Sequence, residues 1–387
     1  MLNGKIGKAI AACAATALLT AALAVSGCSG SDAGDFHDAD LGNGWEVTDS
    51  LELEYAEGFT VDYYDGGYKL ICIENDGRYL VVPDGAEVPD DIDDDIYILE
   101  QPMDHIYMVA TDTMCFFDAL DEIDSISIAS LEADEWESEA AQEAMENGDI
   151  VYGGKYDEPD FEVIVSEGCR LAIESTMINH SPETKEKLED MGITVLTEQS
   201  SYETNPLGRT EWVKLYGALF DKEDLAEEVF EEQIAEVESI ETEDVEDQTV
   251  AFFYINSNGS PVVRKPGDYI TMMISMAGGE YVFSDIDDDE TSSSSITMEV
   301  ESFYIQAKDA DVIIYNSTTI GEISSIDELV EKNDIFEEFA AVQSGNVWCC
   351  EENMYQMAMS SGEIVSEINA ILAGEEDFDY QYFFKLE

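Results

Sequence analysis

Histidine and cysteine are the side chains that most often bind metals or act as nucleophiles, and this 387-residue chain contains few of them. Its three histidines, His37, His105 and His180, are far apart and match no metal-ligand spacing. Its seven cysteines include no CxxC pair, and no GxSxG, HExxH or phosphate-loop motif occurs. The sequence therefore predicts no catalytic residue, no resident metal site and no cofactor.

One cysteine lies in a context that predicts chemistry of another kind. Lys5 and Lys8 precede an uncharged run over residues 9–25, which leads into Val25-Ser26-Gly27-Cys28. This pattern is typical of a bacterial lipoprotein signal peptide, in which small residues expose the bond before a cysteine that receives lipid. The alternative is a transmembrane anchor, but the run is short and weakly apolar for that role. We expect a mature chain that begins at lipidated Cys28 and is anchored to the outer face of the cell membrane.

The remaining cysteines are interpreted as structural. Cys72, Cys115 and Cys169 lie in apolar surroundings typical of small core residues. The adjacent pair Cys349-Cys350 is harder to assign, and binding of haem iron by one of these thiols stays an alternative to a core position.

The charge balance limits the possible partners. The chain has 16 Lys and Arg against 89 Asp and Glu, a formal net charge of −73. Such a charge repels nucleic acid and anionic lipid headgroups, so neither is an expected partner. Because 45% of the residues are hydrophobic, the chain can still form a core. The acidity has two interpretations: a solvated surface suited to a salty or cation-rich medium, or attraction of a cationic ligand.

The type of secondary structure that the sequence predicts changes along the chain. Residues 45–110 show short apolar bursts between Gly and Asp, which predict strands and hairpins. Further on, strands and helices alternate, which indicates mostly parallel sheets covered by helices. The expected strands are at 106–110, 126–128, 171–173, 193–196, 250–255 and 312–315, and the expected helices at 115–120, 181–191, 268–276, 326–332 and 362–372.

Apolar residues also recur at helical spacing from Gly208 to about Glu238, which predicts one long helix. Residues 285–295, acidic and then serine-rich, are expected to form an exposed loop. The predicted fold class is α/β, with two Rossmann-like lobes joined by a single long α-helix and a ligand cleft at the carboxyl ends of the strands. The expected divisions are a signal peptide over 1–27, a lipidated cysteine and tether over 28–44, an N-terminal lobe over 45–204, an interlobe helix over 205–240 and a C-terminal lobe over 241–387.

Several segments, in this order and spacing, make the pattern familiar. They are Val109–Met114, Gly153–Glu162, Asn205–Trp212, Val263–Tyr269 with Ala277–Gly279, Asp309–Tyr315, Gly345–Trp348 and Tyr382–Leu386. Together they resemble the substrate-binding lipoproteins of ABC importers, in the branch with a rigid interlobe helix that carries ferric siderophores, haem and cobalamin. The resemblance implies the class III periplasmic-binding-protein fold. Cys169-Arg170 departs from the family, which usually has Pro-Asp there.

The resemblance implies one docking glutamate on each lobe, paired with arginines of the permease. Glu162 and Glu301 match these positions by their spacing. Two such carboxylates would form charge-assisted pairs that fix the orientation of the receptor.

For the cleft, Arg264 is the leading candidate, because a guanidinium can hold the oxygens of a metal chelate. Its alternative is a pair with one of the many acids. Tyr156, Tyr202, Trp348 and Tyr355 fall in loops expected at the cleft and could stack on a macrocycle or catechol ring. For Trp348, burial in the core is an equal alternative.

Other residues near the cleft are expected to support it. Arg209 and Glu211 should brace the start of the long helix. Met177, Met354, Met357 and Met359 offer soft surface to a ligand or pack in the core.

Three classes of function remain. The favoured one is a receptor that captures a ferric-siderophore-type iron complex and delivers it to an ABC permease and its ATPase subunits, with haem or cobalamin as alternative cargo. The second is an extracytoplasmic enzyme, for which no catalytic motif is found. The third is an acidic surface lipoprotein that binds cations.

Overall fold

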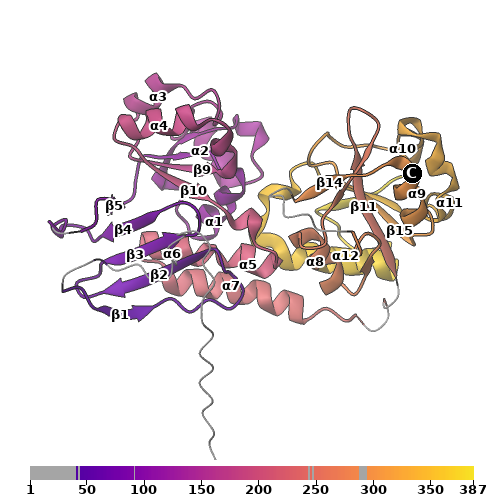
Figure 1. The fold of residues 1–387 in the computed structure, drawn as a ribbon, viewed down its shortest axis with the longest axis horizontal. Coiled ribbons are helices and arrows are strands. Elements are labelled where there is room, and N and C mark those ends of the chain that lie inside the picture. Colours follow the sequence, from indigo (N-terminus) through magenta and orange to yellow (C-terminus); the bar gives the residue numbers. More distant parts are fainter. Residues whose placement is uncertain (1–40, 42–43, 91, 243–244, 246–247, 287–293) are drawn as a thin grey trace, which may run out of the picture. The chain divides into compact units, whose positions relative to one another are not determined.

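The computed structural model describes residues 41, 44–90, 92–242, 245, 248–286 and 294–387 (Figure 1). These residues belong to one unit, 36–387. The expected signal peptide and lipidated Cys28 lie outside the described residues, as do positions 287–293 of the predicted acidic loop. In the part of the chain that is described, no helix has the length and apolar character needed to cross a membrane.

The N-terminal lobe begins with a mixed sheet, formed by the short apolar bursts predicted to be strands. Its strands follow one another in space as in sequence: β1 (Val47–Ser50), β2 (Phe59–Tyr64), β3 (Lys69–Ile73), β4 (Arg78–Val82) and β5 (Ile96–Glu100). Strands β1 to β4 pair antiparallel, and β5 runs parallel to β4. The hairpins bury Phe59 and Val61 on the face that packs toward helix α6 (Val213–Phe220).

A second, parallel sheet completes this lobe, with the order β10-β9-β6-β7-β8. Its strands are β6 (Ile106–Met108), β7 (Ile126–Ala129), β8 (Val151–Tyr152), β9 (Leu171–Ser175) and β10 (Thr194–Glu198). Helices α1 (Met114–Ala119), α2 (Glu139–Asn147), α3 (Phe161–Ser166) and α4 (Pro182–Asp190) connect them. Because both faces of the central strands are covered by other elements, the sequences of these strands are continuously apolar rather than alternately apolar and polar. The predicted strand-helix alternation is confirmed here.

The segment between the lobes differs from the single long helix that was predicted. It consists of α5 (Pro206–Glu211), α6 (Val213–Phe220) and α7 (Glu223–Glu238). Helix α6 ends at Asp221, which adopts a left-handed conformation with φ 56°, a conformation that short polar residues tolerate. A Cβ on Gly217 would lie 2.6 Å from that of Ala226, so α6 and α7 pack in close contact across this turn. The apolar periodicity continues through the break, which explains why the pattern predicted one helix.

Helix α7 packs against the C-terminal lobe through α12 (Ser361–Ala373). The backbone N–H of Gly362 donates a hydrogen bond to Gln233 Oε1 at 3.0 Å. A Cβ at Gly362 would lie 2.9 Å from Glu236 Cβ and 3.0 Å from the Gln233 carbonyl oxygen. The two helices therefore meet without space for a larger residue, which makes this joint stiff.

The C-terminal lobe is built on a sheet with the order β14-β12-β11-β15-β16-β17, in which β13 also pairs with β11. The strands are β11 (Thr249–Ile255), β12 (Pro261–Arg264), β13 (Glu280–Tyr281), β14 (Ser295–Thr297), β15 (Val312–Tyr315), β16 (Val347–Cys350) and β17 (Phe383–Lys385). With α12, the helices are α8 (Tyr269–Met276), α9 (Val300–Ala307), α10 (Ile326–Lys332) and α11 (Ala340–Ser344). Strands β11, β13, β15 and β16 are parallel. The predicted α/β class is confirmed.

Two glutamates fasten the mixed sheet to the interlobe segment. Glu211, fully buried in α5, accepts backbone N–H bonds from Glu54, Tyr55 and Ala56 at 2.8–3.1 Å. Glu203 accepts the N–H groups of the next two residues, 57 and 58, and the indole N–H of Trp212. Consecutive backbone donors that precede β2 are thus satisfied by carboxylates rather than by a strand.

Candidate functional site

Arg209 joins the two lobes through polar contacts. Asn205 caps the start of α5 by accepting the Leu207 N–H, and Pro206 occupies the first helical position, so α5 holds Arg209 in a fixed place. The Arg209 side chain is 4% exposed. Its Nη2 donates to the Tyr355 carbonyl oxygen at 2.6 Å and pairs with Asp112 Oδ2 at 3.2 Å.

These partners come from both lobes. Asp112 follows β6 in the N-terminal lobe, Tyr355 follows β16 in the C-terminal lobe, and the Arg209 guanidinium lies 4.7 Å from the ring centre of Tyr269 in α8. Glu198, buried at the end of β10, is a further carboxyl in this region, and burial followed by the charge of Asp112 raises its pKa. Arg209 therefore joins the two lobes and pairs with protein groups, a wider role than the bracing of the helix start that was expected for it.

A second contact between the lobes uses side-chain amides. Gln356 Nε2 donates to the Glu135 carbonyl oxygen at 2.9 Å, and Gln356 Oε1 accepts the Glu137 N–H at 3.3 Å. Asn353 Nδ2 donates to Glu137 Oε1 at 2.7 Å. Gln356 is buried, so this amide clasp fixes residues 353–357 of the C-terminal lobe against residues 135–137.

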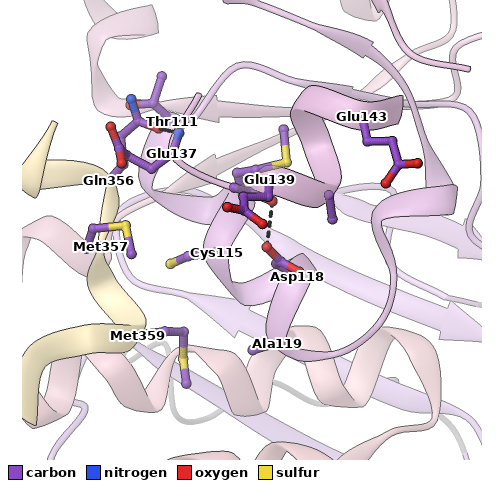
Figure 2. A pocket seen from close by; sticks show the side chains of 13 residues that line it. Thr111, Cys115, Asp118, Ala119, Glu137, Glu139, Glu143, Gln356, Met357 and Met359 are labelled. Carbon is purple, nitrogen blue, oxygen red and sulfur yellow. Dashed lines mark hydrogen bonds between the residues drawn. The ribbon is translucent and has the colours of Figure 1, made fainter. Parts of the chain in front are cut away.

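A pocket of about 640 Å³, the interlobe pocket, lies beside these contacts. It is lined by Thr111, Met114, Cys115, Asp118, Ala119, Glu137, Ser138, Glu139, Ala140, Glu143, Gln356, Met357 and Met359. In Figure 2, Cys115, Met357 and Met359 lie on one part of the wall, and Glu139 and Glu143 on another. Its volume is in the range of small-molecule sites.

Local interactions hold the wall of this pocket. Ser138 caps α2 by accepting the Ala141 N–H, and its hydroxyl donates to Asp118 Oδ2 of α1 at 2.5 Å. Cys115 Sγ donates to the Asp112 carbonyl oxygen at 3.1 Å. Burial raises the pKa of Cys115 to about 12, so the thiol is protonated at neutral pH. The pocket thus has a fixed α1–α2 wall that combines carboxylates with soft sulfur groups.

The residues proposed from the sequence for ligand binding are not all brought together. Tyr355 lies at the junction of the lobes, where its carbonyl binds Arg209. Arg264 pairs with Asp268 at 3.3 Å and donates to Ser294 at 3.1 Å, which is the alternative considered for it. Tyr156 packs on the core of the N-terminal lobe, whereas Tyr202 is 55% exposed.

Trp348 and the adjacent cysteines belong to β16 in the C-terminal lobe. Trp348 is 5% exposed and packs on Tyr380, with ring centres 4.7 Å apart. Cys349 and Cys350 are fully buried, and the N–H of Ser317 donates to Cys350 Sγ. These contacts favour the core alternative for all three residues over contact with a ligand.

The docking candidates lie in matching positions on the two lobes. Glu162 is the second residue of α3 and Glu301 the second residue of α9, and both are exposed. Val165 follows Glu162 by one turn and is 58% exposed, and Ile305 follows Glu301 by one turn and is 64% exposed.

The sequence did not single out Asp118, Glu137, Glu139 or Gln356, which line the pocket. Glu137 and Glu139 follow β7, so the rule that ligands bind beyond the carboxyl ends of parallel strands could have selected them. Gln356 has no such signal, because the sequence does not show which loops of the two lobes meet.

Two α/β lobes joined by helices, with a pocket lined from both, define a two-lobed binding protein. Residues 117–354 match the sequence model of the periplasmic binding protein family, and the chain belongs to this family. The family and the class III fold predicted from the sequence are thus confirmed.

Individual relatives are distant. An uncharacterized lipoprotein of Methanocaldococcus jannaschii is 23% identical over 349 residues, which cover 84% of this chain and 82% of the relative. A periplasmic haem-binding protein from Pseudomonas aeruginosa superposes with a TM-score of 0.58 at 12% identity, covering 73% of this chain and 97% of that one. An ABC-type Fe3+-hydroxamate transport system protein from Saccharomonospora viridis superposes with a TM-score of 0.54 at 19% identity. The superposition covers 70% of this chain and 92% of that one. At these identities, the structural similarity shows that the folds are alike and nothing more.

Proposed function

We propose that this protein is the extracytoplasmic substrate-binding component of an ABC importer, and that it captures a metal chelate between its lobes and delivers it to the permease. The interlobe pocket carries the proposal, because both lobes of a binding-protein fold contribute to its wall. The signal pattern that ends at Cys28 supports a lipid anchor on the outer face of the membrane. Two structural neighbours, a haem-binding protein and a protein of an Fe3+-hydroxamate transport system, support a metal chelate as cargo.

Docking on the permease is proposed to use both lobes at once. Each of the helices α3 and α9 presents an exposed carboxylate, Glu162 or Glu301, beside an exposed apolar side chain, Val165 or Ile305. A carboxylate next to an apolar group fits a partner that offers an arginine flanked by apolar surface, since the guanidinium supplies a charged fork and the apolar groups exclude water.

Cargo capture is proposed to involve small movements of the lobes. Arg209 and the amide clasp join residues of both lobes, and α7 meets α12 at Gly362 without free space. A wide hinge opening would break these contacts, so capture should involve only small shifts that leave them intact.

The test combines charge reversal with cargo binding. Glu162→Lys together with Glu301→Lys should abolish import and leave cargo affinity unchanged. The matched control is Glu146→Lys with Glu337→Lys, which changes the net charge equally at exposed sites on the same two lobes. Normal import by the first double variant would refute the docking assignment.

Cargo is identified by a thermal-shift screen of the protein with ferric siderophores, haem, cobalamin and free metal ions. A ligand at a hundred times its Kd adds about 2.7 kcal/mol of stability. A shift with one chelate supports the receptor function. A shift only with millimolar divalent cations would favour an acidic cation-binding surface lipoprotein instead.

A further inference from the structure

The charged side chains in the described lining of the interlobe pocket are all carboxylates. Its lining includes Asp118, Glu137, Glu139 and Glu143, and none of the described residues that line it is a lysine, arginine or histidine. A smaller neighbouring pocket of about 210 Å³ shares Glu137 and Met357 and is also lined by Glu322, Glu351 and Glu352, and no basic residue is among the described residues of its lining. The space between the lobes is therefore bordered by carboxylates over two adjoining pockets.

Arginines of the cleft region are already paired with protein groups. Arg209 binds Asp112 and the Tyr355 carbonyl, and Arg264 binds Asp268. Lys155 lies 4.0 Å from Glu135. To form an ion pair, an anionic cargo would have to displace these protein groups from the arginines or from Lys155. It would also lie near the carboxylates of the pocket with no positive charge to offset the repulsion.

Beside the carboxylates, the wall of the pocket is apolar and sulfur-bearing. Met114 contributes a thioether to the lining. Met357 and Met359 contribute two more, and Cys115 contributes a protonated thiol (Figure 2). Among the described residues, no group of three or more histidine, cysteine, aspartate or glutamate side chains is arranged to hold a metal ion. A metal that enters this pocket would therefore keep the ligands of its own chelator, whose apolar parts fit the adaptable methionine surface.

We propose that the interlobe pocket selects a metal complex with net positive charge and an apolar ligand shell, and rejects anionic complexes such as ferric tris-catecholates. This inference rests on the proposed receptor function and narrows its substrate class. The apolar shell packs on Met114, Met357 and Met359, and the positive group faces Glu139 and Glu143 on α2. Recognition of a positive charge would also give the carboxylates of the pocket, which are part of the acidic surface, a specific role.

The net charge of −73 would attract any cation weakly, so the experiment must separate the pocket from this background. The probes are three ferric tris-hydroxamate complexes of one size, which carry a pendant ammonium, a pendant hydroxyl or a pendant carboxylate. Their Kd values are measured by calorimetry on the parent protein, on Glu139→Gln with Glu143→Gln, and on two single control variants. The controls are Glu146→Gln, an exposed residue of α2 outside the pocket lining, and Glu337→Gln on the C-terminal lobe.

The expected affinity order is ammonium, then hydroxyl, then carboxylate. The double pocket variant should weaken binding of the ammonium complex by about tenfold, about threefold for each partly exposed carboxylate, and leave the hydroxyl complex unchanged. The control variants should bind all three complexes as the parent does.

Three results would overturn the proposal. Equal or tighter binding of the carboxylate complex, or an unchanged Kd for the ammonium complex in the double variant, would refute charge selection while leaving the receptor function standing. If none of the three complexes bound and the thermal-shift screen found no chelate, the proposed function would fail together with this inference.

Discussion

Replacement of Glu211 by glutamine should detach the segment that precedes β2 from α5. The carboxylate of Glu211 accepts the N–H groups of Glu54, Tyr55 and Ala56, and it lies 3.1 Å from Lys214 Nζ. Glutamine keeps one acceptor oxygen, but its NH2 group faces donors that it cannot satisfy. With hydrogen bonds to a charged group worth about 1.5–3 kcal/mol each, the loss of two amounts to about 4 kcal/mol.

The effect on melting follows from the size of the folded unit. For about 350 residues, an unfolding entropy of about 2.1 cal/mol/K per residue converts 4 kcal/mol into a Tm decrease of about 5 °C. Amide hydrogen exchange adds local evidence, since the Tyr55 and Ala56 amides should exchange faster in the variant than in the parent.

Glu227→Gln is the matched control for this prediction. Glu227 also pairs with Lys214, at 2.9 Å, but its side chain is 47% exposed and accepts no backbone N–H in the hydrogen bonds described. It should shift Tm by less than about 1 °C, as is usual for an exposed ion pair. If Glu211→Gln behaved like this control, the assigned role of the buried carboxylate in holding residues 54–56 would be wrong.

Two further predictions concern buried groups outside the pocket. Glu174 in β9 is fully buried, and burial raises its pKa to about 8 from an ordinary value of 4.5, so the folded state holds the proton more tightly and stability should fall between pH 4.5 and 8. Urea unfolding should therefore show Glu174→Gln equal to the parent near pH 4 and more stable by roughly 3 to 5 kcal/mol above pH 8. Identical pH profiles for the two proteins would contradict this. Trp348→Phe should lower the free energy of unfolding by about 1–2 kcal/mol through lost packing on Tyr380, and calorimetry should show unchanged cargo affinity. A large loss of affinity would instead indicate that Trp348 contacts the cargo.

Much of the fold could be predicted because short periodic segments fix local structure. The strand at Val312–Tyr315 and the helix at Ile326–Lys332 occur at the expected residues. The long interlobe helix was wrong in detail, because Asp221 ends α6 in a left-handed conformation that apolar periodicity does not reveal.

The site was less predictable, because it depends on contacts between distant residues. Arg264 stood out as a rare cation, but its charge pairs with Asp268 four residues later. Gln356 and Glu137 meet across 219 positions of sequence, and neither has a distinctive local pattern. The order and spacing of sequence segments indicated the class of protein, whereas the residues that line the pocket could be identified only from the tertiary structure.

The attachment of residues 54–58 by Glu203 and Glu211 has a consequence for how the sequence can vary. Both glutamates bind backbone N–H groups, so the side chains of the attached segment are not what is recognised. Glu54 and Glu57 are exposed, whereas a Cβ at Gly58 would lie 3.0 Å from the Trp212 ring. Related chains should therefore tolerate almost any residue at positions 54 and 57 but not at 58, and a spectroscopic label at either tolerant position would report on the joint between the mixed sheet and α5 without disturbing it.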